Sequence, residues 1–122
     1  MNVFNELIVK NAVMNANINS PAVPLVNIFG YAIQAVYTGT PNGVLKLQAS
    51  ADSFPYAQVS PQPPTPQNWT DITGTSQTIS SSGIFMWNID GAYYNYVRLV
   101  FTDSSGGTST AVLNVTVNCK GI

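Results

Sequence analysis

The stretch that decides the fold lies near the carboxyl end and reads TAVLNVTVNCK, residues 110–120. Apolar and polar side chains alternate along it. The apolar set consists of Ala111, Leu113, Val115, Val117 and Cys119, and the set between them includes Asn114, Thr116 and Asn118. Because successive side chains of a strand point to opposite faces of a sheet, this pattern predicts a strand with one buried face and one solvent-facing side.

The same alternation recurs along the chain and extends the prediction outward from this strand. Clear strand patterns lie at Tyr31–Thr38, Val44–Ser50, Gly83–Ile89 and Tyr94–Thr102, and weaker ones at Glu6–Met14, Trp69–Ile72 and Gln77–Ser80. No window has sustained helical spacing of apolar residues together with caps. Short strands separated by turns predict an all-β protein, a single antiparallel β-sandwich of jelly-roll-like type that takes up residues 1–122 as one domain.

The strands are separated by residues that favour turns. The segments Thr38–Gly43 and Asp103–Gly107 both contain glycine, which tolerates positive φ angles, and Pro41 and Asn42 add to the first. We expect each segment to join its two flanking strands as a hairpin.

Two further segments are set apart by proline. Pro21 and Pro24 mark off residues 1–24 as an N-terminal strand or arm that can add to the sheet edge of a neighbour, with Val3 and Phe4 as contact residues. Residues 52–68 hold five of the eight prolines and predict a long Pro-rich loop rather than a central strand.

Composition restricts the class of partner. Only 7% of residues are charged, against about 25% in ordinary soluble domains, and the net charge is −1. The four cationic residues are scattered and form no basic stripe, so we expect no nucleic-acid partner. The N-terminus lacks a secretion signal and no apolar run is long enough to cross a membrane, so we expect synthesis as a soluble cytosolic chain and no membrane partner. Near-neutrality favours packing against copies of the chain.

Residues that carry chemistry are scarce. The sequence contains no histidine, one cysteine and five carboxylates. Catalytic triads that need histidine are therefore impossible, and the commonest zinc ligand is missing. Most carboxylates lie in or beside predicted turns, where they cap backbone groups. We expect no enzyme activity, no catalytic residue, no metal and no cofactor.

Aromatic residues remain as candidates for contact. Phe54 and Tyr56 flank Pro55 in the loop, where no core periodicity accounts for them. With Trp69, Tyr93 and Tyr94 they complete the predicted contact set, for either a protein interface or a ligand.

Four stretches also resemble a known group of proteins. They are YAIQAVYTGTPNGVLKLQAS at 31–50, NWTDI at 68–72, FMWNI at 85–89 and YVRLVFT at 96–102. Together with the closing strand, they resemble small structural proteins of tailed-phage virions. This resemblance implies a head decoration, auxiliary capsid or tail-associated subunit that is located in the virion and packs with copies of itself and with other virion proteins. The order of pieces is also similar to discoidin-type sandwiches, which implies the alternative of an adhesion module for host-surface glycan.

Overall fold

The computed structural model describes residues 3–26, 28–52 and 66–121, the side chains of Val3 and Phe4 excepted. These residues form ten strands and no helix. The strands are β1 (Val3–Val13), β2 (Ile18–Asn19), β3 (Val23–Pro24), β4 (Ile28–Thr38), β5 (Gly43–Ser50), β6 (Thr70–Asp71), β7 (Gln77–Ile79), β8 (Gly83–Asp90), β9 (Tyr96–Asp103) and β10 (Val112–Gly121).

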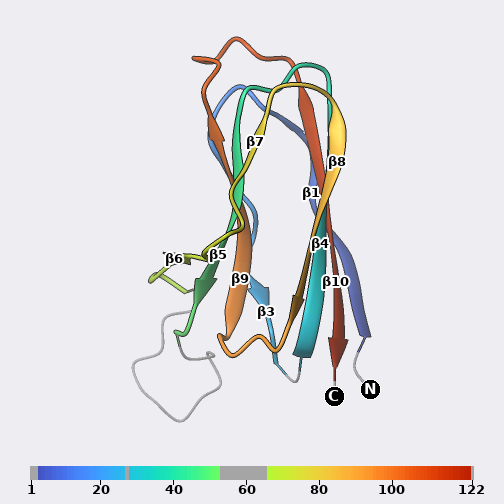
Figure 1. Ribbon diagram of the computed structural model, residues 1–122, viewed down its shortest axis with the longest axis vertical. Coiled ribbons are helices and arrows are strands. Elements are labelled where there is room, and N and C mark those ends of the chain that lie inside the picture. Colours follow the sequence, from blue (N-terminus) through green and yellow to red (C-terminus); the bar gives the residue numbers. More distant parts are fainter. Residues whose placement is uncertain (1–2, 27, 53–65, 122) are drawn as a thin grey trace.

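The strands form two sheets that face each other (Figure 1). Sheet A has the order β1-β10-β4-β8. Sheet B has the order β2-β9-β5-β6, with β3 also paired to β9 and β7 also paired to β5. All of these pairs are antiparallel. The predicted all-β antiparallel sandwich is therefore confirmed.

The pairing is nested in the manner of a jelly roll. The first half of the chain pairs in reverse order with the second half, so that β1 lies beside β10, β2 and β3 beside β9, β4 beside β8, and β5 beside β6 and β7. The pairs β10–β4 and β5–β9 then close each sheet. Counting β2 with β3 and β6 with β7 gives the eight-stranded, two-sheet arrangement of a jelly roll.

The hairpin prediction for Thr38–Gly43 and Asp103–Gly107 is wrong. The first segment leads from β4 in sheet A to β5 in sheet B, and the second leads from β9 in sheet B to β10 in sheet A. Turn residues show where a strand ends, but they do not show which sheet the next strand joins. At the start of β5, Gly43 is required by a close approach, because a Cβ there would collide with the Thr102 carbonyl oxygen and the Phe101 ring.

The core lies between the sheets and comes from the alternating apolar positions. Along β10 the residues Leu113, Val115, Val117 and Cys119 are all fully buried, as their period-two spacing predicts. From sheet B they face Leu45 and Leu47 of β5 and Leu99 and Phe101 of β9, which are equally inaccessible. Burial also raises the pKa of the Cys119 thiol, so Cys119 acts as a small core residue.

The N-terminal segment lies against its own chain. β1 pairs along β10 and forms one edge of sheet A, while β2 and β3 pair with β9. Residues 53–65, the larger part of the expected Pro-rich loop, lie outside the described residues. Next to them, the Asp52 carboxylate accepts backbone hydrogen bonds from Gln67 and Asn68 at 2.7 and 3.0 Å.

Near the start of β4, a pair of tyrosines joins sheet A to the segment between β8 and β9. The hydroxyl groups of Tyr31 and Tyr94 are hydrogen-bonded to each other, and the two rings meet edge to face. Tyr31 is buried, and its pKa is raised strongly, first by desolvation and then by the bond with Tyr94. Desolvation likewise raises the pKa of Tyr94.

The burial pattern predicts that the same Leu→Ala change has a large effect on stability at a core position and a small effect at an exposed one. Leu47→Ala is expected to lower the free energy of unfolding by about 2–5 kcal/mol, because it removes a fully buried side chain and leaves a cavity. Leu7→Ala, the same change at an exposed position of β1, is expected to cost less than about 1 kcal/mol. Urea denaturation measures both. Equal losses would contradict the burial pattern.

The tyrosine pair predicts a loss of stability in alkali. The unfolded chain releases the Tyr31 proton near its ordinary pKa of 10.0, whereas the folded chain retains it. This contribution to stability is therefore complete below pH 10.0 and falls as the pH rises above it, by up to about 1.4 kcal/mol per pH unit for one proton. Denaturation below and above this pH should show a smaller decline in Tyr31→Phe than in the unchanged protein. An identical decline would exclude Tyr31 as the cause.

Candidate functional site

The candidate site is the outer face of sheet A, defined as the side chains of β1, β10, β4 and β8 that point away from the core. Strand register sets these side chains in rows across the sheet. The three central rows are Asn5-Asn118-Ala32-Asn88, Leu7-Thr116-Gln34-Met86 and Asn114-Val36-Ile84. None of these residues is charged, and Leu7, Ile84 and Met86 are exposed large apolar side chains.

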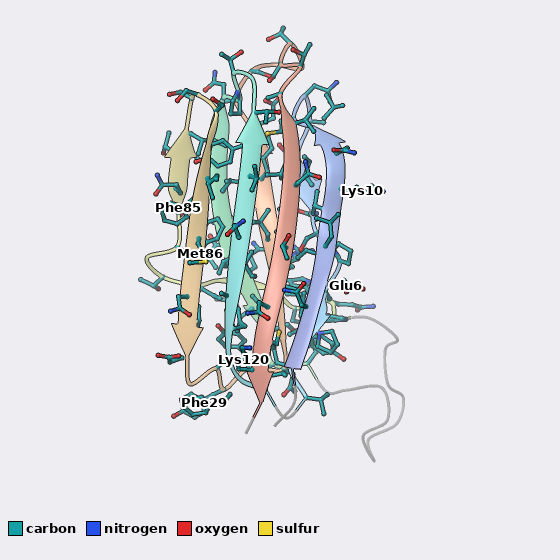
Figure 2. All side chains as sticks on the ribbon, turned by 90° about the vertical axis from the view of Figure 1, so that its right-hand side faces the viewer. Glu6, Lys10, Phe29, Phe85, Met86 and Lys120 are labelled. Carbon is teal, nitrogen blue, oxygen red and sulfur yellow. The ribbon has the colours of Figure 1, made fainter. Side chains whose placement is uncertain are left out.

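Charged residues border this face without entering its central rows. Glu6 and Lys10 belong to β1 at the sheet edge (Figure 2). Lys120 and Asp90 lie opposite Gly30, at the end of the sheet where β1 begins and β10 ends. Phe29, with 55% of its surface exposed, lies at the same end. The result is a face of amide, hydroxyl and apolar groups with charge only at its rim.

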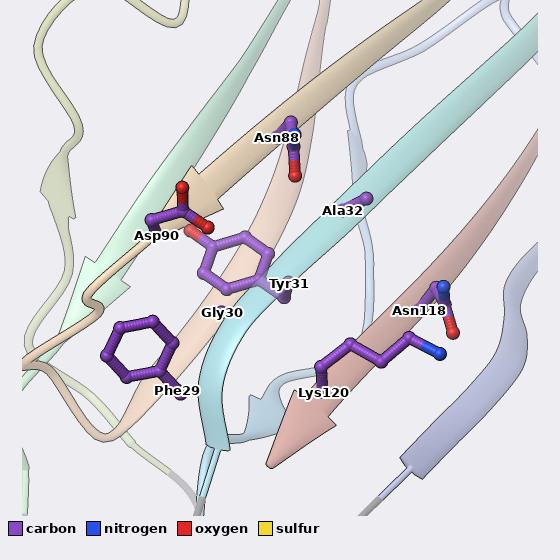
Figure 3. A pocket seen from close by; sticks show the side chains of 8 residues that line it. All are labelled: Phe29, Gly30, Tyr31, Ala32, Asn88, Asp90, Asn118 and Lys120. Atoms are coloured by element: carbon purple, nitrogen blue, oxygen red, sulfur yellow. The ribbon is translucent and has the colours of Figure 1, made fainter. Parts of the chain in front are cut away.

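A groove runs along β4 on this face because two small residues form its floor. Gly30 and Ala32 lie between bulkier neighbours, with Asn88 and Asp90 of β8 on one side and Asn118 and Lys120 of β10 on the other (Figure 3). A Cβ at Gly30 would come within 2.9 Å of the Ile89 carbonyl oxygen, so the backbone contact itself favours glycine.

The groove consists of two adjoining hollows. The first has a volume of about 230 Å³ and includes the residues around Gly30. The second, of about 250 Å³, is lined by Asn5, Ala32, Gln34, Met86, Thr116 and Asn118. Ala32 and Asn118 belong to both, so the hollows adjoin along the sheet. Four amide side chains, which both donate and accept hydrogen bonds, belong to the lining: Asn5, Gln34, Asn88 and Asn118.

The outer face of sheet B is different, because its charged groups are already paired. Register places Gln48 of β5 opposite both Arg98 of β9 and Asp71 of β6. Its Oε1 accepts two bonds from the Arg98 guanidinium at 2.7 and 2.9 Å, and its Nε2 donates to Asp71 at 2.8 Å. Lys46 makes an ion pair with Asp71 at 3.0 Å. The bonds from Gln48 and then Lys46 lower the pKa of Asp71.

Trp69 belongs to this paired network. The Arg98 guanidinium carbon lies 4.3 Å from the centre of the Trp69 ring, a cation–π contact that covers one face of the indole. Partial desolvation lowers the pKa of Arg98. The ring face expected to contact a partner is thus occupied by a residue of the same chain.

The other predicted contact residues that the structure describes do not form one site with Trp69. Tyr93 is 97% exposed, whereas Tyr94 turns inward to Tyr31. Val3 and Phe4 begin β1, opposite Lys120 and Cys119 of β10, and their side chains are outside the description. Phe54 and Tyr56 lie outside the described residues.

The residues of the groove and of the central rows were missed by sequence reasoning. In the segment Gly83–Ile89 attention falls on the alternating aromatic set, Phe85 and Trp87, which the structure indeed turns inward. The alternate set of Ile84, Met86 and Asn88 carries the useful signal, since it places large apolar residues where a solvent-facing strand should be polar. That anomaly is visible in the sequence once the inward face is assigned.

Among residues 3–26, 28–52 and 66–121, no three His, Cys, Asp or Glu side chains gather as a metal site. No helix in the same ranges is long and apolar enough to span a membrane.

Comparison with known proteins identifies the fold. The sequence matches no protein-family model and has no significant match among curated proteins. Among solved structures, the chain is similar to the crystal structure of the SPBc2 prophage-derived protein YomS. The TM-score is 0.62 over 97% of this chain and 92% of that chain, at 10% sequence identity. At this identity the likeness establishes the fold, a two-sheet β-sandwich, and nothing finer.

Proposed function

We propose that this chain is a non-enzymatic structural subunit of a bacteriophage particle, a head decoration, auxiliary capsid or neck- or tail-associated protein that acts by packing against other subunits. Its partners are other virion proteins and copies of itself, and its location is the virion. The observation that carries the proposal is the outer face of sheet A, whose central rows are free of charge and expose Leu7, Ile84 and Met86.

Such a face is suited to burial against protein. Removing charged side chains from water is costly unless each is paired, so a surface without charge is desolvated at lower cost. Interface cores are depleted in charge and enriched in Met and aromatic residues, and the rim is polar. The outer face of sheet A resembles this arrangement, with Met86 in its middle row on the edge strand β8 and charged residues at its border.

The fold supports a phage setting. The similar sandwich of a prophage-derived protein agrees with the resemblance that the sequence itself bears to virion proteins. The paired network on sheet B supports the choice of face, because Gln48 bonds to both Arg98 and Asp71 there and Lys46 forms an ion pair with Asp71.

A matched pair of lysine variants tests the proposal. Thr116 lies in the central row of the outer face of sheet A, and Thr102 is exposed on β9 of sheet B. Thr116→Lys should lower incorporation into particles at least about tenfold, since an unpaired buried charge costs more than the ~1.4 kcal/mol that a factor of ten represents. Thr102→Lys should be incorporated normally.

Mass spectrometry and immunoblotting of purified particles measure the result, with thermal unfolding as the check that both variants fold. If the unchanged chain is absent from particles, the structural role is wrong. If both lysine variants are incorporated alike, the outer face of sheet A is not the contact surface.

A second candidate function, binding of a neutral host-surface glycan, is favoured by the groove along β4. Sugar hydroxyls need partners that both donate and accept, and Asn88, Asn118 and Gln34 are such groups. The exposed ring of Phe29 at the groove end offers an apolar surface for sugar C–H groups.

Glycan-array binding tests this second function. Asn118→Ala should weaken binding about tenfold, because a good hydrogen bond to a ligand is worth about 1.4 kcal/mol. Asn19→Ala, at an exposed position of β2, should have no effect. A blank array rejects the function, and binding lost on Tyr56→Ala but kept in Asn118→Ala would move the site to the loop.

A further inference from the structure

The four edges of the two sheets are protected unequally. A sheet edge presents unpaired backbone groups, and proteins usually blunt it with charge, proline, bulges or short strands. β1 carries Glu6 and Lys10, two register shifts, and a positive φ at Asn11. β2 and β3 are two residues each, and Pro24 belongs to β3.

The remaining two edges differ sharply from each other. On sheet B, β6 and β7 are two and three residues long. On sheet A, β8 is eight residues long, pairs with β4 without a register shift, and has no Pro, Lys or Arg. Its single charge, Asp90, is its last residue. Among the described residues, β8 is the one long edge strand that has no proline, no bulge and no charge before its last residue (Figure 2).

The direction of the free backbone groups follows from the hydrogen bonds of sheet A. Gly91 N donates to Phe29 O at 3.0 Å, which continues the register that pairs Ile89 with Tyr31. Because backbone groups of alternate residues point to opposite neighbours, Phe85, Trp87 and Ile89 face β4. Ile84, Met86, Asn88 and Asp90 therefore direct their N–H and C=O groups to the open edge.

We propose that β8 is a dimerisation edge, at which β8 of a second copy pairs antiparallel about a two-fold axis at Met86 and joins two A sheets into one. The proposal deepens the structural role proposed above and rests on it for its biological setting. Strand addition requires a donor with free backbone groups of its own. Within the described chain, β8 itself is the long strand that meets this requirement, which makes a second copy the fitting occupant.

The register of β8 against β8 of the second copy follows from the alternating direction of its backbone groups and from the position of Asp90. The outward-pointing groups belong to even-numbered residues, so even positions must pair with even positions. Centring on Met86 places Met86 opposite its copy and Ile84 opposite Asn88 of the partner, while Asp90 stays beyond the paired segment. Centring on Trp87 would instead set Ile84 against the Asp90 carboxylate. The first register covers Ile84 and Met86, which are now 66% and 56% exposed, without bringing like charges together.

A disulfide cross-link tests this register. Directly opposed residues of a hydrogen-bonded antiparallel pair have Cα atoms about 5.5 Å apart, within the range a disulfide spans. Met86→Cys should therefore form a covalent dimer under mild oxidation. Ile84→Cys, on the same face and strand, is the matched control, because the two copies of residue 84 would lie about 14 Å apart and should stay unlinked.

Sedimentation measures the dimer without a cross-link. The unchanged chain should sediment as a dimer, and Asn88→Pro as a folded monomer that still unfolds cooperatively, because this proline removes an N–H that faces the open edge. Its melting temperature should fall only by the part that dimerisation contributes. Thr116→Lys, two strands away on β10, should remain dimeric.

Each outcome is decisive. A monomeric unchanged chain, equal linking of both cysteine variants, or a dimer in which Met86→Cys fails to link overturns the β8 pairing. The cross-link tests the pairing of β8, whereas the composition of particles tests the structural role. A chain that is found in particles but is a monomer in solution therefore overturns this inference and leaves the proposed function in place.

Discussion

The contact between the inward faces of β10 and β4 in sheet A and β9 and β5 in sheet B is the interaction on which the rest of the structure depends. There is no helix in the described chain and a single cysteine in the sequence, so neither a covering layer nor an intramolecular disulfide holds the sheets together. Leu47, Leu99, Leu113 and Val115 are fully inaccessible at this contact. Packing of alternate apolar side chains must supply the stability.

That constraint determines what is available for function. Every second residue of the central strands is committed to the core, so the outward set alone can recognise a partner. On sheet B the outward set closes on itself through Gln48, which joins Arg98 to Asp71. On sheet A the three central rows are uncharged and open, and charge is confined to the rim, where Asp90 and Lys120 line the end of the groove above Gly30. The two outer faces of the sandwich therefore differ, because the charged groups of sheet B are bonded within the chain while the central rows of sheet A carry no charge.

The edge strand β8 borders this outer face of sheet A and is held in place from its inner side. Trp87 points inward from β8 and donates through Nε1 to the Thr75 carbonyl oxygen at 2.8 Å, which ties the edge strand to the segment between β6 and β7. Phe85 packs edge to face against it, with ring centres 4.9 Å apart. β8 is therefore anchored on its inner side, while its outward backbone groups have no pairing strand within the described chain. In the assembly we propose, the edge contacts a copy of the chain and the face contacts a different protein.

The sequence by itself determined the class of fold, the approximate position of most strands and the inward set of β10, because period-two alternation is a local property. The missing histidine also led to the prediction of a role without catalysis, which stays a prediction. Tertiary structure decided which strands are neighbours. Thr38–Gly43 and Asp103–Gly107 have turn composition that suits either a hairpin or a crossing, and only long-range packing selects the crossing. Likewise Trp69 was predicted as a contact residue, but the fold brings Arg98, which follows 29 residues later in the chain, over its ring. The groove and the unguarded edge arise in the same way, from pairing between strands that are distant in sequence, which no local pattern encodes.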